Sequence, residues 1–183
     1  MGFLGFTLAE LMVCLGITAV LIVLAVPAIA NRLPDFRLRR AARDLCANMR
    51  SAKMGAVRAN TPWAIVFDHA GGGYAVCSDK GEDGLWATLS DNTVVTRVLL
   101  SGYGSGVRYG WGAASRPVSG TFDADGITYR VPFVNVVQFN SRGSCGSGYV
   151  YLQNNENHTF GVGTRWTGAV LLRKWHAASG DWK

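Results

Sequence analysis

The chain has 183 residues, a formal net charge of +6 and a pI near 9.4. Its length accommodates one membrane segment and one globular domain of about 150 residues, and its 23 glycines are typical of a β domain with many tight turns. The positive charge permits an anionic partner without requiring one, and no Cys-x-x-Cys or Cys/His spacing indicates a zinc site.

Residues 6–30 form an apolar segment that contains one carboxylate, Glu10. As an α-helix rising 1.5 Å per residue, this segment is roughly 37 Å long, which is enough to cross a bilayer. A charge in the middle of a membrane helix costs roughly 2.5 to 3.5 kcal/mol on insertion scales, so Glu10 is expected to have a partner and a function. A cleavable secretory signal is the alternative, because Ala28-Ile-Ala30 fits its small-x-small cleavage pattern. The lack of Lys and Arg ahead of the segment opposes that alternative.

The stretch Gly5-Phe-Thr-Leu-Ala-Glu-Leu11 resembles the N-terminus of type IV pilins and type II secretion pseudopilins. In that family a prepilin peptidase cuts after the Gly, the new N-terminal Phe is methylated, and a nearby Glu governs assembly. The resemblance therefore implies cleavage between Gly5 and Phe6, N-methylation of Phe6 and an assembly role for Glu10. Pro27 falls where pilins commonly carry a helix-loosening proline.

Two later stretches, Phe139-Asn-Ser-Arg-Gly143 and Thr167-Gly-Ala-Val170, resemble the minor-pilin branch called GspH/FimT-like. The expected fold is α+β and pilin-like, with a long N-terminal helix whose first half spans the membrane and whose second half packs on an antiparallel β-sheet domain. The implied parts are a leader (1–5), a transmembrane and filament-core helix (6–30), an amphipathic continuation of the helix (31–59) and a β-rich domain (60–183).

The second half of this helix is expected to begin near Asp35, because Pro34 interrupts the helical pattern. Apolar residues then recur at alternating steps of four and three, the spacing of a helix that packs by one face. These residues are Leu38, Ala42, Leu45, Met49, Ala52 and Ala56. Basic residues lie mostly off this stripe, where they would face solvent or the acidic residues of neighbouring subunits.

Beyond Pro62 the hydrophobic period changes to that of strands, and the turn-rich stretch 68–73 predicts a hairpin. Because no helical pattern separates the strands, the sheet is expected to be antiparallel. The predicted strands are 63–67, 74–77, 85–89, 93–100, 107–111, 127–133, 134–139, 149–152, 158–162 and 169–175.

Cysteine use suits an exported domain that holds one disulfide. Cys14 lies in the apolar segment and is expected to pack as a small hydrophobe. Cys77 ends a predicted strand and Cys145 lies in a turn, so these two are expected to pair with each other. Cys46, beside Leu45 on the helix, is expected to be a buried thiol.

The sequence does not predict an enzyme, a cofactor or a metal site. His69, His158 and His176 are scattered, and no nucleophile motif accompanies them. Asp123-Ala-Asp-Gly126 has the oxygen density of a calcium loop but lacks the later Glu, so a plain turn is the preferred interpretation.

The C-terminal region interleaves cations with aromatic side chains, a pattern that holds single-stranded nucleic acid by charge neutralisation and base stacking. The candidate DNA contacts are Arg165, Trp166, Arg173, Lys174 and Trp175. Some GspH/FimT-like minor pilins bind DNA through a Gly-Arg-x-Arg stretch, but the matching stretch here, Gly168-Ala-Val-Leu171, is apolar at both Arg positions. An ordinary last strand with a mixed surface is therefore preferred.

The resemblance implies a minor pilin or minor pseudopilin, a structural subunit that serves in assembly of a type IV pilus-like filament or at its tip. The alternatives are a minor pseudopilin of a type II secretion system, a DNA-binding minor pilin for DNA uptake, and a plainly secreted domain. The implied partners are other pilin or pseudopilin subunits, prepilin peptidase, the inner membrane and, in the DNA-uptake alternative, DNA. The implied location is the bacterial inner membrane, as a single-pass protein, and then an extracellular or periplasmic filament.

Overall fold

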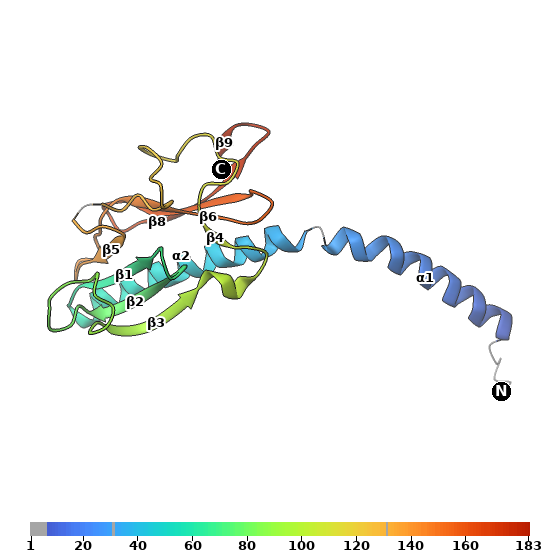
Figure 1. Cartoon of the computed structure of the whole chain (residues 1–183). Helices are drawn as coiled ribbons and strands as arrows, with labels where there is room; N and C mark the ends of the chain where they lie inside the picture. The colour runs from blue at the N-terminus through green and yellow to red at the C-terminus, as the bar shows by residue number, and fades with distance from the viewer. Residues whose placement is uncertain (1–6, 31, 131) are drawn as a thin grey trace. The chain divides into compact units, whose positions relative to one another are not determined.

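The computed structural model describes residues 7–30, 32–130 and 132–183. The chain divides into two compact units, Met1–Leu33 and Pro34–Lys183. The first unit contains helix α1 (Leu8–Ala30). The second contains nearly all of helix α2 (Leu33–Ala59) and two antiparallel sheets, labelled in Figure 1. The fold is therefore α+β, as the sequence predicts.

The two sheets have four and five strands. The first follows the order β3-β2-β1-β5 and the second the order β4-β6-β7-β8-β9. The strands are β1 (Trp63–Asp68), β2 (Gly73–Asp79), β3 (Thr93–Leu99), β4 (Arg108–Tyr109), β5 (Val136–Phe139), β6 (Gly148–Gln153), β7 (Thr159–Thr164), β8 (Val170–His176) and β9 (Asp181–Trp182), and a 3-10 turn (Leu100–Tyr103) follows β3.

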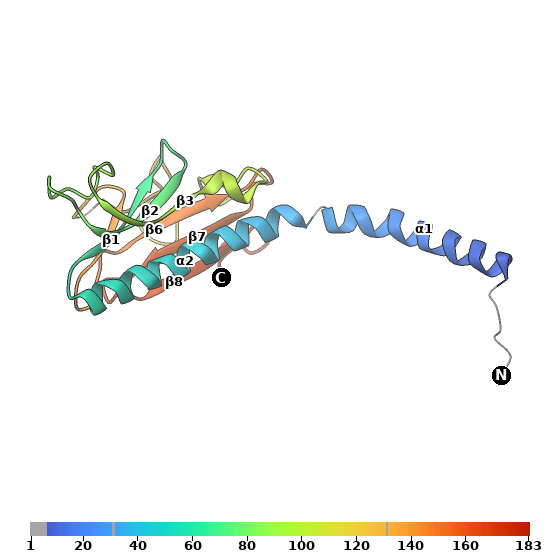
Figure 2. The same cartoon turned by 90° about the horizontal axis from the view of Figure 1, so that it is seen from below.

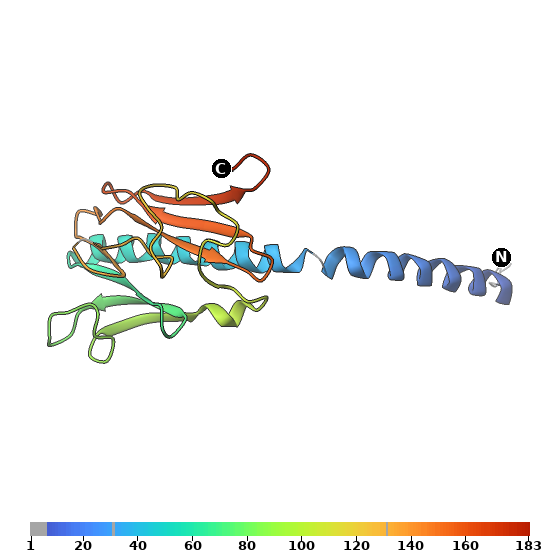
Figure 3. The same cartoon turned by 45° about the horizontal axis from the view of Figure 1, so that its top comes forward.

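Helix α2 lies along one face of both sheets (Figures 2 and 3). All six residues of the predicted stripe are fully buried, which confirms that prediction. They share one core with the first sheet, through residues such as Ile65 and Phe67, and with the second sheet, through Val150 and Leu152. Pro34 lies in the first turn of α2, where its missing N–H has no helical partner to lose.

The predicted hairpin is confirmed, because β1 and β2 pair in register from Ala64↔Cys77 to Asp68↔Gly73. Asp68 accepts a hydrogen bond from the backbone N–H of Gly71 at 2.7 Å. Gly72 has φ +64°, a conformation that favours glycine, so the sequence Gly71-Gly-Gly73 suits this turn.

Two predicted strands are wrong. Residues 85–89 form turns instead, and the Trp86 side chain is buried against the face of the first sheet that points away from α2. Over the described part of 127–133, only an isolated bridge between Ile127 and Val150 forms. That segment is bent by side-chain hydrogen bonds, in which Arg130 and Asn135 both donate to Asp125.

Candidate functional site

Helix α1, taken by itself, is apolar and exposed on every side. Over Leu8–Ala25 none of the helix is buried, and its length and composition suffice to cross a membrane. The exposed side chains include Leu11 (55%), Leu15 (60%) and Leu24 (66%). A helix that is hydrophobic all round is stable only where lipid or other helices cover it. The coverage of α1 must therefore come from its surroundings.

Glu10 lies in the first turn of α1 and closes a capping box with Thr7. The Glu10 carboxylate accepts hydrogen bonds from the Thr7 backbone N–H (3.0 Å) and hydroxyl (2.9 Å). The Thr7 hydroxyl in turn accepts one from the Glu10 backbone N–H (3.2 Å). This reciprocal pair satisfies donors that would otherwise be orphaned at the start of the helix. The carboxylate thus already has local partners in the single chain.

The residues of the predicted processing site, Gly5 and Phe6, lie outside the described residues. Their cleavage and methylation stay predictions, as does the assembly role of Glu10.

The five candidate DNA contacts do not form one surface. Lys174 points to the α2 side of the second sheet, where it pairs with Asp35 at 2.7 Å and lies 5.5 Å from the Phe160 ring centroid. Trp175 points to the opposite side and is only 7% exposed, because Trp182 covers it with ring centroids 5.3 Å apart.

The other three contacts remain accessible. Arg165 and Trp166 lie in the turn between β7 and β8, where the Trp166 side chain is 73% exposed. Arg173 is half-buried on the same side of β8 as Trp175. The residues that are interleaved in the sequence therefore lie on two separate faces of the second sheet and in a turn.

Strand β9, which was missed in the sequence, accounts for the burial of Trp175. It pairs with β8 through Trp175↔Trp182 and His176↔Asp181. The available signal was Gly180, whose φ of +58° suits the tight turn just before the strand. A strand of two residues is too short to leave a periodic pattern.

The predicted Cys77–Cys145 disulfide is not formed, and all four cysteines are free thiols. Cys77 packs beneath Trp86 on the face of the first sheet that points away from α2, whereas Cys145 packs against the core on the α2 side. The two thiols therefore lie on opposite faces of packed structure, and a disulfide cannot cross it. Cys46 is buried, as predicted.

Burial makes the thiols of Cys77 and Cys145 weaker acids than a free cysteine. Burial raises the pKa of the Cys77 thiol to about 11, and burial also raises the pKa of Cys145. The two carboxylates of the predicted turn at 123–126 pair with one guanidinium, with Arg130 lying 3.3 Å from Asp123 and 3.0 Å from Asp125. Within the described residues, no group of three or more His, Cys, Asp or Glu side chains could hold a metal ion.

The face of α2 that points away from the sheets carries large apolar side chains. Phe36 is 59% exposed, Met54 57% and Val57 49%. Exposed arginines, among them Arg43 and Arg50, lie between them along the helix. This combination of apolar and cationic side chains is typical of a helix face that meets a partner.

Comparison with known proteins gives two structural matches. Both are crystal structures of the type IV minor pilin FimU of Pseudomonas aeruginosa, in two crystal forms. The first is 15% identical in sequence, with a TM-score of 0.49 over 74% of this chain and 87% of that chain. The second is 14% identical, with a TM-score of 0.47 over 74% and 91% of the two chains. No protein-family model and no curated protein sequence matches the chain.

Proposed function

We propose that this protein is a minor subunit of a type IV pilus-like filament, with a structural role in filament assembly or at the tip. The observation that carries the proposal is α1, a bilayer-length apolar helix that places one carboxylate, Glu10, in its first turn. A plain membrane anchor needs no such charge, which is costly in lipid. A minor pseudopilin of a type II secretion system is the alternative assembly, because it would use the same helix.

Before assembly, α1 is proposed to hold the subunit in the bacterial inner membrane. Prepilin peptidase would cut between Gly5 and Phe6, and methylation of Phe6 would follow. The subunit would then leave the bilayer for an extracellular or periplasmic filament, in which α1 packs among the helices of other subunits. The exposed face of α2, with Phe36 and Met54, would continue that packing outside the lipid.

The proposed role of Glu10 is to change partners during assembly. In the single chain, the Thr7 N–H and hydroxyl satisfy the carboxylate. In the filament, the carboxylate would pair with the methylated amine of Phe6 in a neighbouring subunit. Two opposite charges buried together with good hydrogen bonds avoid the large penalty of burying either one alone.

Binding of DNA is not part of this proposal. Lys174 is engaged with Asp35, and Trp175 lies beneath Trp182, so two of the five candidate contacts face other parts of the protein.

The experiment compares Glu10→Ala with Thr7→Val. Glu10→Ala should be processed and remain in the membrane pool at wild-type level but be absent from sheared filaments. Thr7→Val loses the hydroxyl of the capping box and keeps the carboxylate, so it should still assemble. Intact mass should show a mature chain that begins at N-methyl-Phe6 in both variants. Equal recovery of Glu10→Ala and wild type in filaments would refute the role of Glu10, and a mature N-terminus at Asn31 would refute the filament function altogether.

A further inference from the structure

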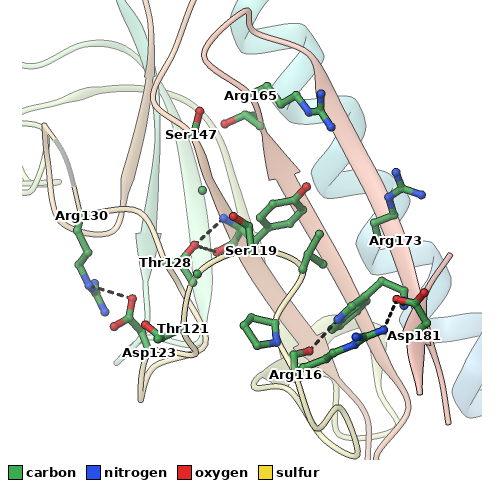
Figure 4. A pocket seen from close by; sticks show the side chains of 17 residues that line it. Arg116, Ser119, Thr121, Asp123, Thr128, Arg130, Ser147, Arg165, Arg173 and Asp181 are labelled. Carbon is green, nitrogen blue, oxygen red and sulfur yellow. Dashed lines mark hydrogen bonds and ion pairs between the residues drawn. The ribbon is translucent and has the colours of Figure 1, made fainter. Parts of the chain in front are cut away.

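The outer face of the second sheet holds a cavity of about 1010 Å³ (Figure 4). It lies between the loop 116–128 and strands β6, β7 and β8, on the side of the sheet that points away from α2. We refer to this cavity as the arginine groove, because Arg116, Arg130, Arg165 and Arg173 all line it. Its volume is about that of a site for a ligand of drug size or larger.

The floor of the groove is made by Tyr149 on β6, which lies across Gly163 on β7. A Cβ atom at position 163 would collide with the Tyr149 ring, so the ring can lie flat only because this residue is glycine. The floor of the hollow thus depends on a glycine at one specific position in β7.

The loop that forms the wall of the groove is held at several points. Trp182 donates a hydrogen bond from its indole N–H to the Arg116 carbonyl at 2.8 Å. The Val118 backbone N–H donates to the Tyr151 hydroxyl at 3.0 Å. Farther along, the Phe122 ring meets the Tyr151 ring edge-on with centroids 5.1 Å apart. The wall is therefore pre-organised, which lowers the cost of ordering it when a ligand binds.

Only two of the four guanidinium groups are neutralised. Arg116 pairs with Asp181 at 2.9 Å, and Arg130 pairs with Asp123 at 3.3 Å. Within the part of the chain that the structure describes, Arg165 and Arg173 form no ion pair, and Figure 4 shows both on the β8 side of the groove. These two cations are available for a negatively charged ligand.

The remaining lining is rich in hydroxyl and carboxylate groups. Ser119, Thr121 and Ser147 contribute hydroxyls, and Asp123 and Asp181 contribute carboxylates. Carboxylates repel a ligand with a charge on every unit, but they accept hydrogen bonds from the hydroxyls of a sugar. The guanidinium groups bind carboxylates through two parallel hydrogen bonds.

We infer that the arginine groove binds an acidic oligosaccharide, in which uronic acid carboxylates meet Arg165 and Arg173 and sugar hydroxyls meet Asp123 and Asp181. Single-stranded nucleic acid fits the groove less well, because its bases need exposed aromatic faces on which to stack. The two aromatic side chains that line the groove, Tyr149 and Trp182, are only 8% and 9% exposed. This binding does not depend on the filament function and can be tested on the isolated subunit.

The experiment measures binding of a tetrasaccharide in which glucuronic acid alternates with N-acetylglucosamine, so that only every second unit is charged, to the full chain by calorimetry. The chain is kept in an amine-oxide detergent, because a detergent with a sugar headgroup would compete for the groove. The double variant Arg165→Ala/Arg173→Ala should raise the Kd at least tenfold. The matched control Arg58→Ala/Arg142→Ala removes two exposed arginines outside the groove and should leave the Kd within about twofold of wild type.

Ser147→Trp supplies a second test, because it fills the groove without removing a charge and should also weaken binding at least tenfold. Cellotetraose, which has no charge, should not bind, and an eight-residue oligo-dT should bind more weakly than the uronide. No binding of the uronide by wild type, or an equal loss in the arginine control, would overturn the inference. Tighter binding of oligo-dT than of the uronide would identify a nucleic-acid site and would also overturn it.

Discussion

Helices α1 and α2 follow one another in the chain but differ in how their apolar side chains are covered. α1 exposes large apolar side chains all round and buries none of its membrane-length window. α2 buries a stripe of eight residues against the two sheets and exposes a face of arginines with a few apolar side chains. The same type of secondary structure is thus stabilised by internal packing in one case and by its surroundings in the other.

This difference identifies which parts of the chain determine stability and which determine assembly. Burial of apolar surface is the main favourable term in folding, and α2 contributes it within the globular unit. Over Leu8–Ala25, α1 taken by itself buries none of its apolar surface, so its sequence is suited to the bilayer and to packing among other helices. The predictions below test this division by making matched changes in the two helices.

The largest effect is expected from one substitution made at two places, Leu45→Ala and Leu15→Ala. Leu45 is fully buried, whereas Leu15 is 60% exposed. Leu45→Ala should lower the free energy of unfolding by about 2 to 5 kcal/mol, because it leaves a cavity in the core. Leu15→Ala should change this free energy by less than about 0.5 kcal/mol.

The measurement is urea unfolding of the full chain in detergent, followed by tryptophan fluorescence. All tryptophans lie at or beyond Trp63, so the signal reports the globular unit alone. A loss for Leu15→Ala as large as that for Leu45→Ala would show that α1 contributes to the stability of this unit and would contradict the division.

The sequence predicted α2 and most of the strands because their patterns are local. The stripe from Leu38 to Ala56 follows from helical spacing, and the first hairpin follows from Gly71-Gly-Gly73 between two apolar runs. The capping box was equally accessible, since Thr7 and Glu10 have the spacing of that motif. The motif was not predicted, because Glu10 was interpreted from its charge alone.

The errors come from contacts that the spacing of residues does not encode. Residues 85–89 have the composition of a strand, but the Trp86 side chain instead packs against the first sheet. Its indole N–H donates a hydrogen bond to the Gln138 side-chain oxygen at 2.6 Å. The predicted pairing of Cys77 with Cys145 is wrong because the two thiols lie on opposite sides of packed structure. The spacing of the cysteines in the sequence does not determine on which side each one lies. The arginine groove was missed for the same reason, since its arginines come from three separate stretches of chain.

A smaller, pH-dependent effect is expected at Asp125, where charge rather than apolar packing holds the structure. Burial by itself would raise the pKa of Asp125, but hydrogen bonds from Asn135, from the Ile127 N–H and from Arg130 outweigh it and hold this pKa below its usual value. The folded state therefore favours the ionised form. This stabilisation is present above the unfolded pKa of about 3.9 and is lost as the pH falls through the lower folded pKa.

Asp125→Asn should therefore be less stable than wild type at pH 7, and the difference should narrow as the pH is lowered through this window. Urea unfolding at a series of pH values measures it. Leu45→Ala serves as the control, because an apolar cavity should lower stability by the same amount at each pH. A constant difference for Asp125→Asn would mean that the ionised carboxylate is not what stabilises this segment.

The smallest effect on stability is expected at Met54, on the outer face of α2. Met54 is 57% exposed, whereas Met49 on the same helix is fully buried. Met54→Ala should change the free energy of unfolding by less than about 0.5 kcal/mol, because more than half of the side chain is exposed to solvent and alanine suits a helix. Met49→Ala should cost about 2 to 5 kcal/mol for the reason given for Leu45.

The informative result is the comparison of this stability with filament recovery. If the outer face of α2 meets neighbouring subunits, Met54→Ala should lower the amount of subunit in sheared filaments at matched expression while its unfolding curve stays at the wild-type position. The lost contact would then belong to assembly alone. Full recovery of Met54→Ala in filaments would mean that neighbouring subunits do not depend on this face of α2. The helix contacts needed for assembly would then be those of α1.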